Sequence, residues 1–405
     1  MAQETGGRED KDIVSSIFQR GNKPKVSSLF THKESKTSFN KSSDNTLRKT
    51  AFSAKVKRRL PAGLDIGADS IKVVRLGYDQ DNSLRVADVL IEPIPREDEI
   101  DIKSRARLAS VILKRITKEY GLDEGCFAAL PSQLNKIDLL VLPEMPENEV
   151  DKALRWELKQ TLESDINSIV IDYVVLNNQR KRFLGNMTGA LTVTADKKSV
   201  FEYMAFLESS GVKALALDAG QLADLEVLDR IKAVSAGEVV LLLDIGAGKS
   251  MLSIICEKET VSVRSIGCSG DSLTRAIRDY CQVPWKKAEE FKKISGVSGG
   301  GDIQVKNAIF PILENMAQDI EHTFKYFSFQ VAKSQITRFD RIVLSGGVSL
   351  MPGLVSFVSR RLNVNVEIVD PFKISPCGDS RGCEKASLMG PGMNTAMGLA
   401  LRGVG

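Results

Sequence analysis

Two short stretches of this chain carry residue types that could hold a chain of phosphates. Each is typical of a strand, a glycine-containing turn and a second strand, with an aspartate where the first strand ends: GLDIGADSIKVVRL (63–76) and LLLDIGAGKS (241–250). Glycine lets backbone N–H groups approach phosphate oxygens without a clash from Cβ. An aspartate at this place can hold Mg²⁺ through its water shell, which the ion sheds reluctantly. The pattern predicts a nucleotide site between two hairpins, with Asp65 and Asp244 as the magnesium aspartates.

The second stretch ends in Gly-Lys-Ser, yet it does not fit a P-loop. That motif needs another glycine five residues before Gly248, and the chain has Leu243 there, inside an apolar run. A P-loop also leads into a helix, whereas the residues that follow, MLSII (251–255), are typical of a strand. The dinucleotide fingerprint fails as well, because a third glycine is missing at position 251.

Two lysines could add positive charge to such a site. Lys72 is on the predicted return strand of the first hairpin, where it can reach phosphates as a point charge. Lys249, in the second turn, could do the same or face solvent. A third element is the pair Gly346 and Gly347, between a predicted strand and helix, where missing side chains leave room for an adenosine. Each motif is common by itself, but three of them in this order and spacing are a strong indication of a nucleotide site.

The composition excludes several classes of protein. The 405 residues, 42% of them hydrophobic, can build a core for at least two lobes. No apolar run is long enough for a membrane-spanning helix, and the first twenty residues lack the apolar segment of a secretory signal. His32 and His322 are the only histidines, too few for a histidine metal site. We expect the six scattered cysteines, Cys377 and Cys383 included, to be buried, reduced thiols of a cytosolic protein.

The positive charge of the chain belongs to its N-terminal end. Residues 1–59 hold 14 Lys and Arg against 6 Asp and Glu, a net charge of +8, which leaves −4 for the rest. This tail is rich in Ser, Thr, Asn and Lys, so we expect residues 1–60 to be a disordered, solubilising extension. Weak contact with an anionic membrane surface is the functional alternative. Nucleic-acid binding is disfavoured, because no aromatic residues or structured basic patch accompany the charges.

The two hairpin motifs repeat each other in outline, DIGA at 65–68 and DIGA at 244–247. Such a duplication predicts an α/β protein with two related lobes facing each other across a cleft. Between the motifs, periodicity predicts a helix at 104–122 and a compact strand–helix–strand–strand unit at 137–195. After the second motif we expect two short helices, a long helix at 308–332, the Gly-Gly turn, an irregular segment at 375–392 and a closing helix at 394–402.

Together these residues resemble the actin-like ATPase superfamily, and within it the PilM family of type IV pilus assembly proteins, relatives of the division protein FtsA. The resemblance covers about residues 61–403 and includes LPEMPENEVDKALRWELKQ, IDYVVL, SGDSLTRAI, KKAEEFK, IVLSGGVSLMPGL and MGLALRG. ALRWE together with IDYVVL points to the PilM family. The implied fold is an actin-like ATPase with an inserted FtsA-type subdomain, 1C. Lobe 1 would be 61–134 with 197–238, subdomain 1C would be 135–196, and lobe 2 would be 239–405 with a small cap at about 270–308.

The resemblance also implies a set of ligand-binding residues. Those that match the family's two phosphate motifs are Asp65, Gly67, Ser70, Lys72, Asp244, Gly246, Gly248 and Ser250. Those that match the adenosine turn and the cap helix are Gly346, Gly347, Glu289 and Lys292. For the last two, a solvated face with an i,i+3 ion pair is the alternative. The implied cofactors are ATP and Mg²⁺.

The family implies a place at the bacterial inner membrane. Its members bind ATP in the cytoplasm, and a short N-terminal peptide of the membrane protein PilN docks near subdomain 1C. Other pilus platform proteins, and self-association, are further expected partners. Trp156 lies on the predicted helix of subdomain 1C, and we expect it in the core rather than in contact with that peptide.

Two departures from the family bear on activity. The segment SGDS (269–272) starts with Ser-Gly where the family usually has Gly-Gly. In LDAGQ (217–221), Gly220 occupies the position where active ATPases of the superfamily carry an acidic or amide residue that orients water. Asp218 and Gln221 are the remaining candidates for that task, so at most weak hydrolysis is expected.

Three classes of function stay open. A nucleotide-binding scaffold needs binding residues but no efficient base, which Gly220 favours. A slow ATPase, or a kinase of the same superfamily, would need a clear catalytic aspartate and a substrate pocket. An FtsA-like filament, or the equivalent component of a type II secretion system, is the third alternative.

Overall fold

The computed structural model describes residues 56–96, 102–162, 165–176, 184–375, 377 and 382–404, with side chains of the first helix from 105 onward. Most of the predicted basic extension, residues 1–55, lies outside this part. Strand β1 (Arg58–Ile66) begins inside the predicted range of 1–60 and buries Leu60, so the extension is shorter than the sequence indicated. Arg58, the first residue of β1, pairs with Tyr78 of the next strand, which extends the sheet toward the N-terminus of the chain.

The first sheet has the strand order β3-β2-β1-β4-β8, with β2 (Ser70–Tyr78), β3 (Leu84–Pro93), β4 (Cys126–Leu130) and β8 (Ala214–Ala219). Strands β1, β2 and β3 are antiparallel neighbours, whereas β4 and β8 join in parallel and therefore need crossover connections. Helix α1 (Ile102–Tyr120) forms the first crossover and buries Ala109, Leu113, Ile116 and Tyr120 at helical spacing.

The second sheet repeats this arrangement, in the order β11-β10-β9-β12-β13. Its strands are β9 (Val239–Ile245), β10 (Ser250–Cys256), β11 (Glu259–Ile266), β12 (Arg341–Ser345) and β13 (Asn365–Ile368). Again three antiparallel strands are followed by two parallel ones. The duplication expected from the repeated DIGA motif is thereby confirmed. Strands β3 and β11, which complete the two meanders, had no separate prediction.

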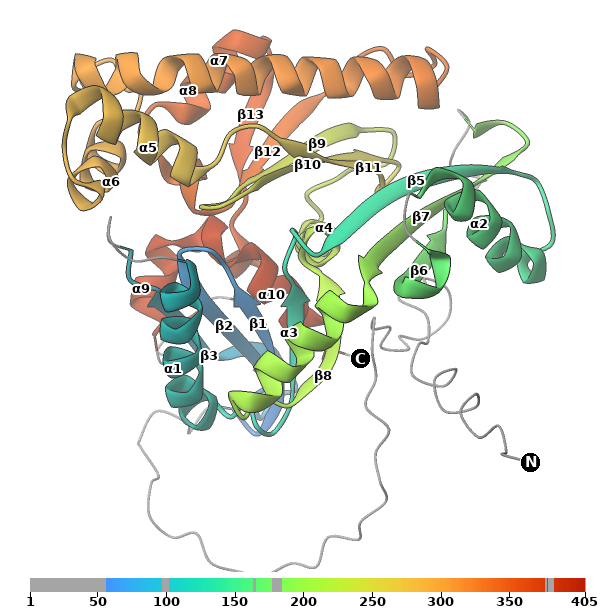
Figure 1. Ribbon diagram of the computed structural model, residues 1–405, viewed down its shortest axis with the longest axis horizontal. Helices are drawn as coiled ribbons and strands as arrows, with labels where there is room; N and C mark the ends of the chain where they lie inside the picture. The colour runs from blue at the N-terminus through green and yellow to red at the C-terminus, as the bar shows by residue number, and fades with distance from the viewer. Residues whose placement is uncertain are drawn as a thin grey trace, which may run out of the picture.

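A smaller sheet, β5-β7-β6, lies to one side of the two main sheets (Figure 1). It contains β5 (Asn135–Pro143), α2 (Glu147–Thr161), β6 (Ile169–Val175) and β7 (Met187–Asp196), in the predicted element order. Helix α2 packs Val150 and Leu154 against one face of this sheet. The far strand of the second sheet touches β5, where Arg264 donates to Asp138 across 2.9 Å.

Helices fill the space around the sheets. Helices α4 (Gly220–Arg230) and α10 (Asn394–Leu401) pack so closely that a Cβ on Gly398 would lie 1.9 Å from a backbone oxygen of α4. Figure 1 shows α7 (Ile303–Tyr326) crossing the top of the second sheet, next to a pair of short helices. The other helices are α3 (Lys197–Ser209), α5 (Gly270–Cys281), α6 (Trp285–Ile294), α8 (Leu354–Leu362) and α9 (Cys383–Leu388). No helix in the described ranges is long and apolar enough to span a membrane.

Two sequence expectations are wrong. Trp156, expected in the core, is 63% exposed, because it lies on the face of α2 opposite to the buried Val150 and Leu154. The segment 375–392, expected to be irregular, contains α9.

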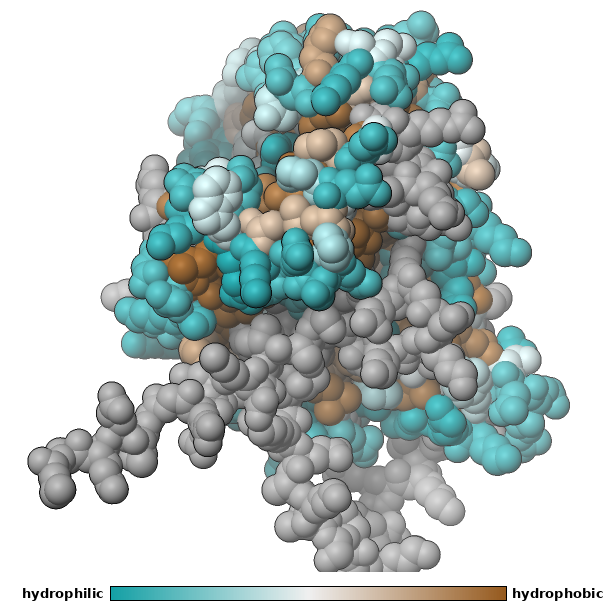
Figure 2. All heavy atoms as spheres, turned by 90° about the vertical axis from the view of Figure 1, so that its right-hand side faces the viewer, coloured by the Kyte–Doolittle hydropathy of each residue, from teal (hydrophilic) through white to brown (hydrophobic). Residues whose placement is uncertain are grey.

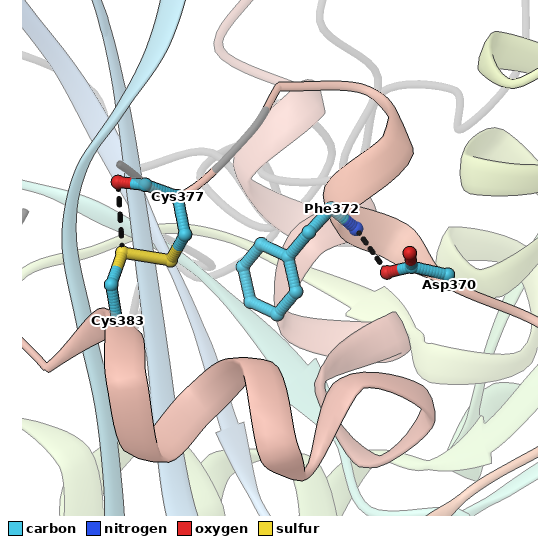
Figure 3. The surroundings of a disulfide bond; sticks show 4 residues. All are labelled: Asp370, Phe372, Cys377 and Cys383. Carbon is cyan, nitrogen blue, oxygen red and sulfur yellow. Dashed lines mark hydrogen bonds between the residues drawn. A yellow bond between two sulfur atoms is a disulfide. The ribbon is translucent and has the colours of Figure 1, made fainter. Parts of the chain in front are cut away.

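The expectation that all six cysteines are reduced is also wrong, since Cys377 and Cys383 form a disulfide (Figure 3). Their spacing matches no redox or metal motif, so the pairing was not visible in the sequence. Cys383 directly follows Gly382, which lies against the backbone of Val89 in the first sheet. The other cysteines, Cys126, Cys256, Cys268 and Cys281, are free.

A thiol count tests this pairing. Protein purified without reductant and then unfolded should show four reactive thiols, and all six after reduction, because only Cys377 and Cys383 are bonded. The Cys377→Ser/Cys383→Ser variant should give four in both states. Six thiols before reduction would contradict the bond.

Candidate functional site

A cavity of about 400 Å³ lies between the two main sheets. Both hairpin turns line it, together with the start of α4, the Gly346–Gly347 turn and the cap helices α5 and α6. The size is within the range of small-molecule sites. The structure therefore brings the separate sequence motifs to one place.

The first hairpin holds a lysine–aspartate pair at the cavity. The N–H of Gly67 donates to the carbonyl of Ser70 across 3.0 Å, which closes the turn. Asp65 and Lys72 are register partners on β1 and β2, and Lys72 Nζ donates to Asp65 Oδ2 across 2.9 Å. Burial by itself lowers the pKa of Lys72, but the charges of Asp65 and Asp244 raise it above its ordinary value. Lys72 therefore stays protonated and can attract an anion.

The second hairpin repeats this turn without an equivalent of Lys72. Gly246 donates to the carbonyl of Lys249 across 3.2 Å, and a Cβ on Gly246 would lie 2.7 Å from that oxygen, so glycine is required here. Burial raises the pKa of Asp244 to about 6, against the opposing effect of Lys72. Ser250 is fully buried and does not line the cavity, although Ser70, its counterpart in the first hairpin, does.

The sequence left open whether Lys249 reaches toward phosphates or faces solvent. Its ammonium group donates to the backbone carbonyl of Ser132 across 2.8 Å, in the connection between β4 and β5. It therefore links the second hairpin to the base of the small sheet, and it lines the cavity at the same time.

Both glycines of the Gly-Gly turn line the cavity. Gly346 has a φ of +81°, and a Cβ there would lie 2.4 Å from the carbonyl oxygen of Ile245. Gly347 is different, because a Cβ on it would meet no atom within 4 Å. It opens onto the cavity, where a side chain would occupy ligand space.

Glu289 and Lys292 do not form a solvated pair. Lys292 is 5% exposed and donates to Glu289 across 2.7 Å and to Thr274 across 2.8 Å. Burial lowers the pKa of Lys292, and the charge of Lys292 brings the pKa of Glu289 below its ordinary value in spite of burial. Both residues line the cavity from the cap.

Of the two candidates for orienting water, Asp218 and Gln221, only Gln221 lines the cavity. Asp218 is buried, does not line the cavity, and accepts a hydrogen bond from Arg402 Nε across 2.8 Å. Gln221 does line the cavity, and its Oε1 is buried without a hydrogen-bond partner among the described residues.

Sequence reasoning missed several polar residues of the cavity, among them Asp224, Arg96 and Asp271. Asp224 lies three residues after Gln221 on α4, a spacing that places both on one face of a helix. Burial and the charge of Asp244 raise the pKa of Asp224 well above its ordinary value. Arg96, just after β3, pairs across the cleft with Asp271 of α5, and its guanidinium carbon lies 5.7 Å from the ring centre of Trp285.

The lining suits a phosphate chain that arrives with a cation. Among the described residues, no hydrogen bond occupies the backbone N–H groups of Ala68 and Gly248, one in each hairpin turn. These groups and Lys72 can receive phosphate oxygens. The same cavity is lined by the carboxyl groups of Asp65, Asp244 and Asp224, and these would repel the phosphates unless a divalent cation offsets their charge. In the described ranges, no three Asp, Glu, His or Cys side chains are grouped as direct ligands of a metal ion. A cation in this cavity would therefore contact the carboxyl groups through its water shell.

Comparison with known proteins identifies the family. The family model for the type IV pilus assembly protein PilM matches residues 63–404. The chain belongs to the PilM family. The solved PilM-PilN type IV pilus biogenesis complex contains a chain with 25% identity and a TM-score of 0.71, in a match that covers 85% of this chain and 98% of that one. This PilM family member therefore has the actin-like ATPase fold that its sequence predicted.

More distant proteins are also similar. Cell division protein FtsA of Enterococcus hirae is 22% identical over 355 residues, which are 78% of this chain and 79% of FtsA. The structure of MreB5 of Spiroplasma citri bound to ADP is 15% identical with a TM-score of 0.45, covering 82% of this chain and 95% of that one. The latter is too distant to bear on the ligand of this chain.

Gly347→Val should block the cavity without harming the fold. Because the added side chain enters open space, we expect an unchanged unfolding temperature and a loss of affinity for a fluorescent ATP analogue of about ten-fold or more. Gly300→Val is the control, since it too enters open space but lies away from the cavity. Equal nucleotide binding by the two variants would show that Gly347 does not face the ligand.

Proposed function

We propose that this chain is an ATP-binding scaffold of the type IV pilus assembly platform at the bacterial inner membrane. The observation that carries the proposal is the single cavity into which both duplicated hairpins, the Gly-Gly turn and the cap helices converge. A scaffold of this kind uses the nucleotide to hold its two lobes together, and the closed form binds a partner. Lobe 1 would be 61–134 with 197–238, the 1C unit 135–196, and lobe 2 the residues from 239 on.

The phosphate end of ATP would lie between the hairpins. Backbone N–H groups of the two turns and Lys72 would hold the phosphates, with Gly67, Gly246 and Gly248 permitting the close approach. Asp65 and Asp244 would hold Mg²⁺ through its water shell, and bound Mg²⁺ supplies the charge that lets phosphates and carboxylates share the cavity.

The adenosine end would lie against the cap. The Gly346–Gly347 turn leaves one side open, and Glu289 and Lys292 present polar atoms from the other side, next to the base and ribose.

Turnover of ATP is proposed to be weak at most. Asp218 is held by Arg402 outside the cavity lining, so its carboxylate is not placed to act on a water near the phosphates. Gln221 reaches the cavity, but an amide can orient water and does not act as a strong base.

The partner is proposed to be the N-terminal peptide of a PilN-like membrane protein. A PilM chain that is similar in structure to this one was solved in a complex with PilN. Trp156 supports docking near the 1C unit, because an exposed tryptophan is a frequent anchor in interfaces. Figure 2 views the molecule from the side that carries α2 and β6 in Figure 1, and apolar atoms lie exposed among polar ones on this face.

One contact offers a route from nucleotide to partner. Lys249 lines the cavity and binds the carbonyl of Ser132, directly before β5 of the 1C unit. Phosphates that attract Lys249 would change this contact and thereby the orientation of the small sheet.

Further platform proteins and a second copy of the chain are also proposed as partners. Membrane contact by the basic extension falls on residues 1–55, outside the described part.

Isothermal titration tests the scaffold directly. Wild-type protein should bind Mg·ATP and then bind a synthetic PilN-like N-terminal peptide, whereas Asp244→Ala should lose about 10–100-fold in Mg·ATP affinity and with it the peptide binding. Asp123→Ala, an exposed aspartate outside the cavity, is the control. Peptide binding that is the same with and without nucleotide would contradict the proposed gating.

The role of Trp156 has its own test. Trp156→Ala should weaken peptide binding by about ten-fold or more, because it removes a large apolar contact, and should leave Mg·ATP binding unchanged. Tyr280→Ala, which removes an equally exposed aromatic from α5, should leave peptide binding unchanged. Equal peptide affinity of both variants would place the docking surface elsewhere.

A further inference from the structure

The cavity contains a third buried carboxylate whose presence nothing in the proposed function explains. Asp224 is 1% exposed and lines the cavity from the second turn of α4. The hydroxyl of Thr395 donates to its Oδ1 across 2.8 Å. The side chain of Asn394 also favours the charged form of Asp224. A buried carboxylate is costly unless it is compensated, and two neutral side chains compensate only part of that cost.

The charged groups that act most strongly on Asp224 are acidic. The strongest charges acting on it are those of Asp244 and then Asp65, which are both negative. Lys72 offsets Asp65 directly, through its 2.9 Å ion pair. Of these three cavity aspartates, Asp244 and Asp224 are therefore the ones without an ion-pair partner of their own among the described residues.

Gln221 supplies a second, independent observation. It is 6% exposed, it precedes Asp224 by less than one turn of α4, and it lines the same cavity. Its Oε1 accepts no hydrogen bond from any described residue. A buried amide oxygen in this state calls for a donor in the cavity, and a water molecule bound to a cation is a strong donor.

We propose that Asp224, assisted by Gln221, holds the water shell of the divalent cation that accompanies the nucleotide, on the side facing Asp244. Asp224 is a positioning residue, because it acts on the ion through water: in the described ranges no three acidic, His or Cys side chains are grouped for direct ligation. Helix α4 thereby adds a third carboxylate to the two contributed by the hairpins. This inference rests on the proposed function, since it assumes that nucleotide binds here.

The experiment measures how strongly metal and nucleotide bind together. ATP affinity is determined by titration calorimetry in saturating Mn²⁺ and again in EDTA, and the ratio of the two dissociation constants is the coupling. In Asp224→Asn, which keeps size and the acceptor for Thr395, the coupling should fall about ten-fold. ATP affinity in EDTA should stay equal or become tighter, because one repelling charge is gone. A merely structural role would weaken binding in both conditions alike.

Two further variants complete the design. Asp229→Asn makes the same charge change at an exposed position of the same helix, and its coupling should equal that of the wild type. Gln221→Met removes the amide but keeps the carboxylate, and its coupling should fall by a smaller factor than in Asp224→Asn. Thermal unfolding confirms that each variant is folded.

The outcomes separate the two proposals. Wild-type coupling in Asp224→Asn overturns the inference and leaves the proposed function standing, as does an equal loss of affinity in Mn²⁺ and in EDTA. If the wild-type chain binds no ATP in either condition, the proposed function fails and the inference fails with it.

Discussion

Aspartates at the ends of β1 and β9 constrain the rest of the cleft. Each ends the middle strand of a five-stranded sheet, so the two sheets must face each other for Asp65 and Asp244 to share one cavity. Like charges in such surroundings repel, and burial raises the pKa of Asp244 to about 6. Lys72 offsets part of this repulsion from β2, and α4 and α10 fix the spacing by close packing. Lys72 offsets Asp65 alone by an ion pair, and the proposed ligand, a polyanion that arrives with a cation, would bring the charge that the other carboxyl groups lack.

Among the contacts around this cavity, three join the second sheet or α5 to the connections of the first sheet or to the small sheet. Arg96 pairs with Asp271, Lys249 donates to the carbonyl of Ser132, and Arg264 pairs with Asp138 at the 1C sheet. A ligand that touches both hairpins stabilises whichever arrangement of the lobes keeps these contacts together. Two of the three contacts involve the connection into the 1C unit or the unit itself. The position of the 1C unit therefore depends on its contacts with Lys249 and Arg264. The proposed control of partner binding by nucleotide would act through these contacts.

The departures of this chain from its family have local explanations. Ser269 stands where a glycine is usual, and it caps α5 by accepting from the N–H of Ser272 across 3.2 Å, while Ser272 returns a bond to the N–H of Ser269. A Cβ on the next residue, Gly270, would lie 3.1 Å from the backbone of Ala247, so a side chain there would be crowded. Gly220 lacks the expected polar side chain, but Gln221 and Asp224 bring polar atoms to the cavity from the same helix.

Local rules in the sequence were enough to predict the duplicated frame, the order of elements in the 1C unit and the glycine turns that line part of the cavity. Alternation, helical spacing and glycine turns act within about ten residues, and the repeated DIGA motif marks equivalent strand ends. Tertiary structure decided the rest. Only tertiary packing shows that Asp218, at the end of β8, faces Arg402, whereas Asp224, on α4, faces the cavity, because both neighbours come from distant parts of the chain. The exposure of Trp156 and the Cys377–Cys383 bond likewise depend on which surfaces meet, and no periodicity in a single chain records that.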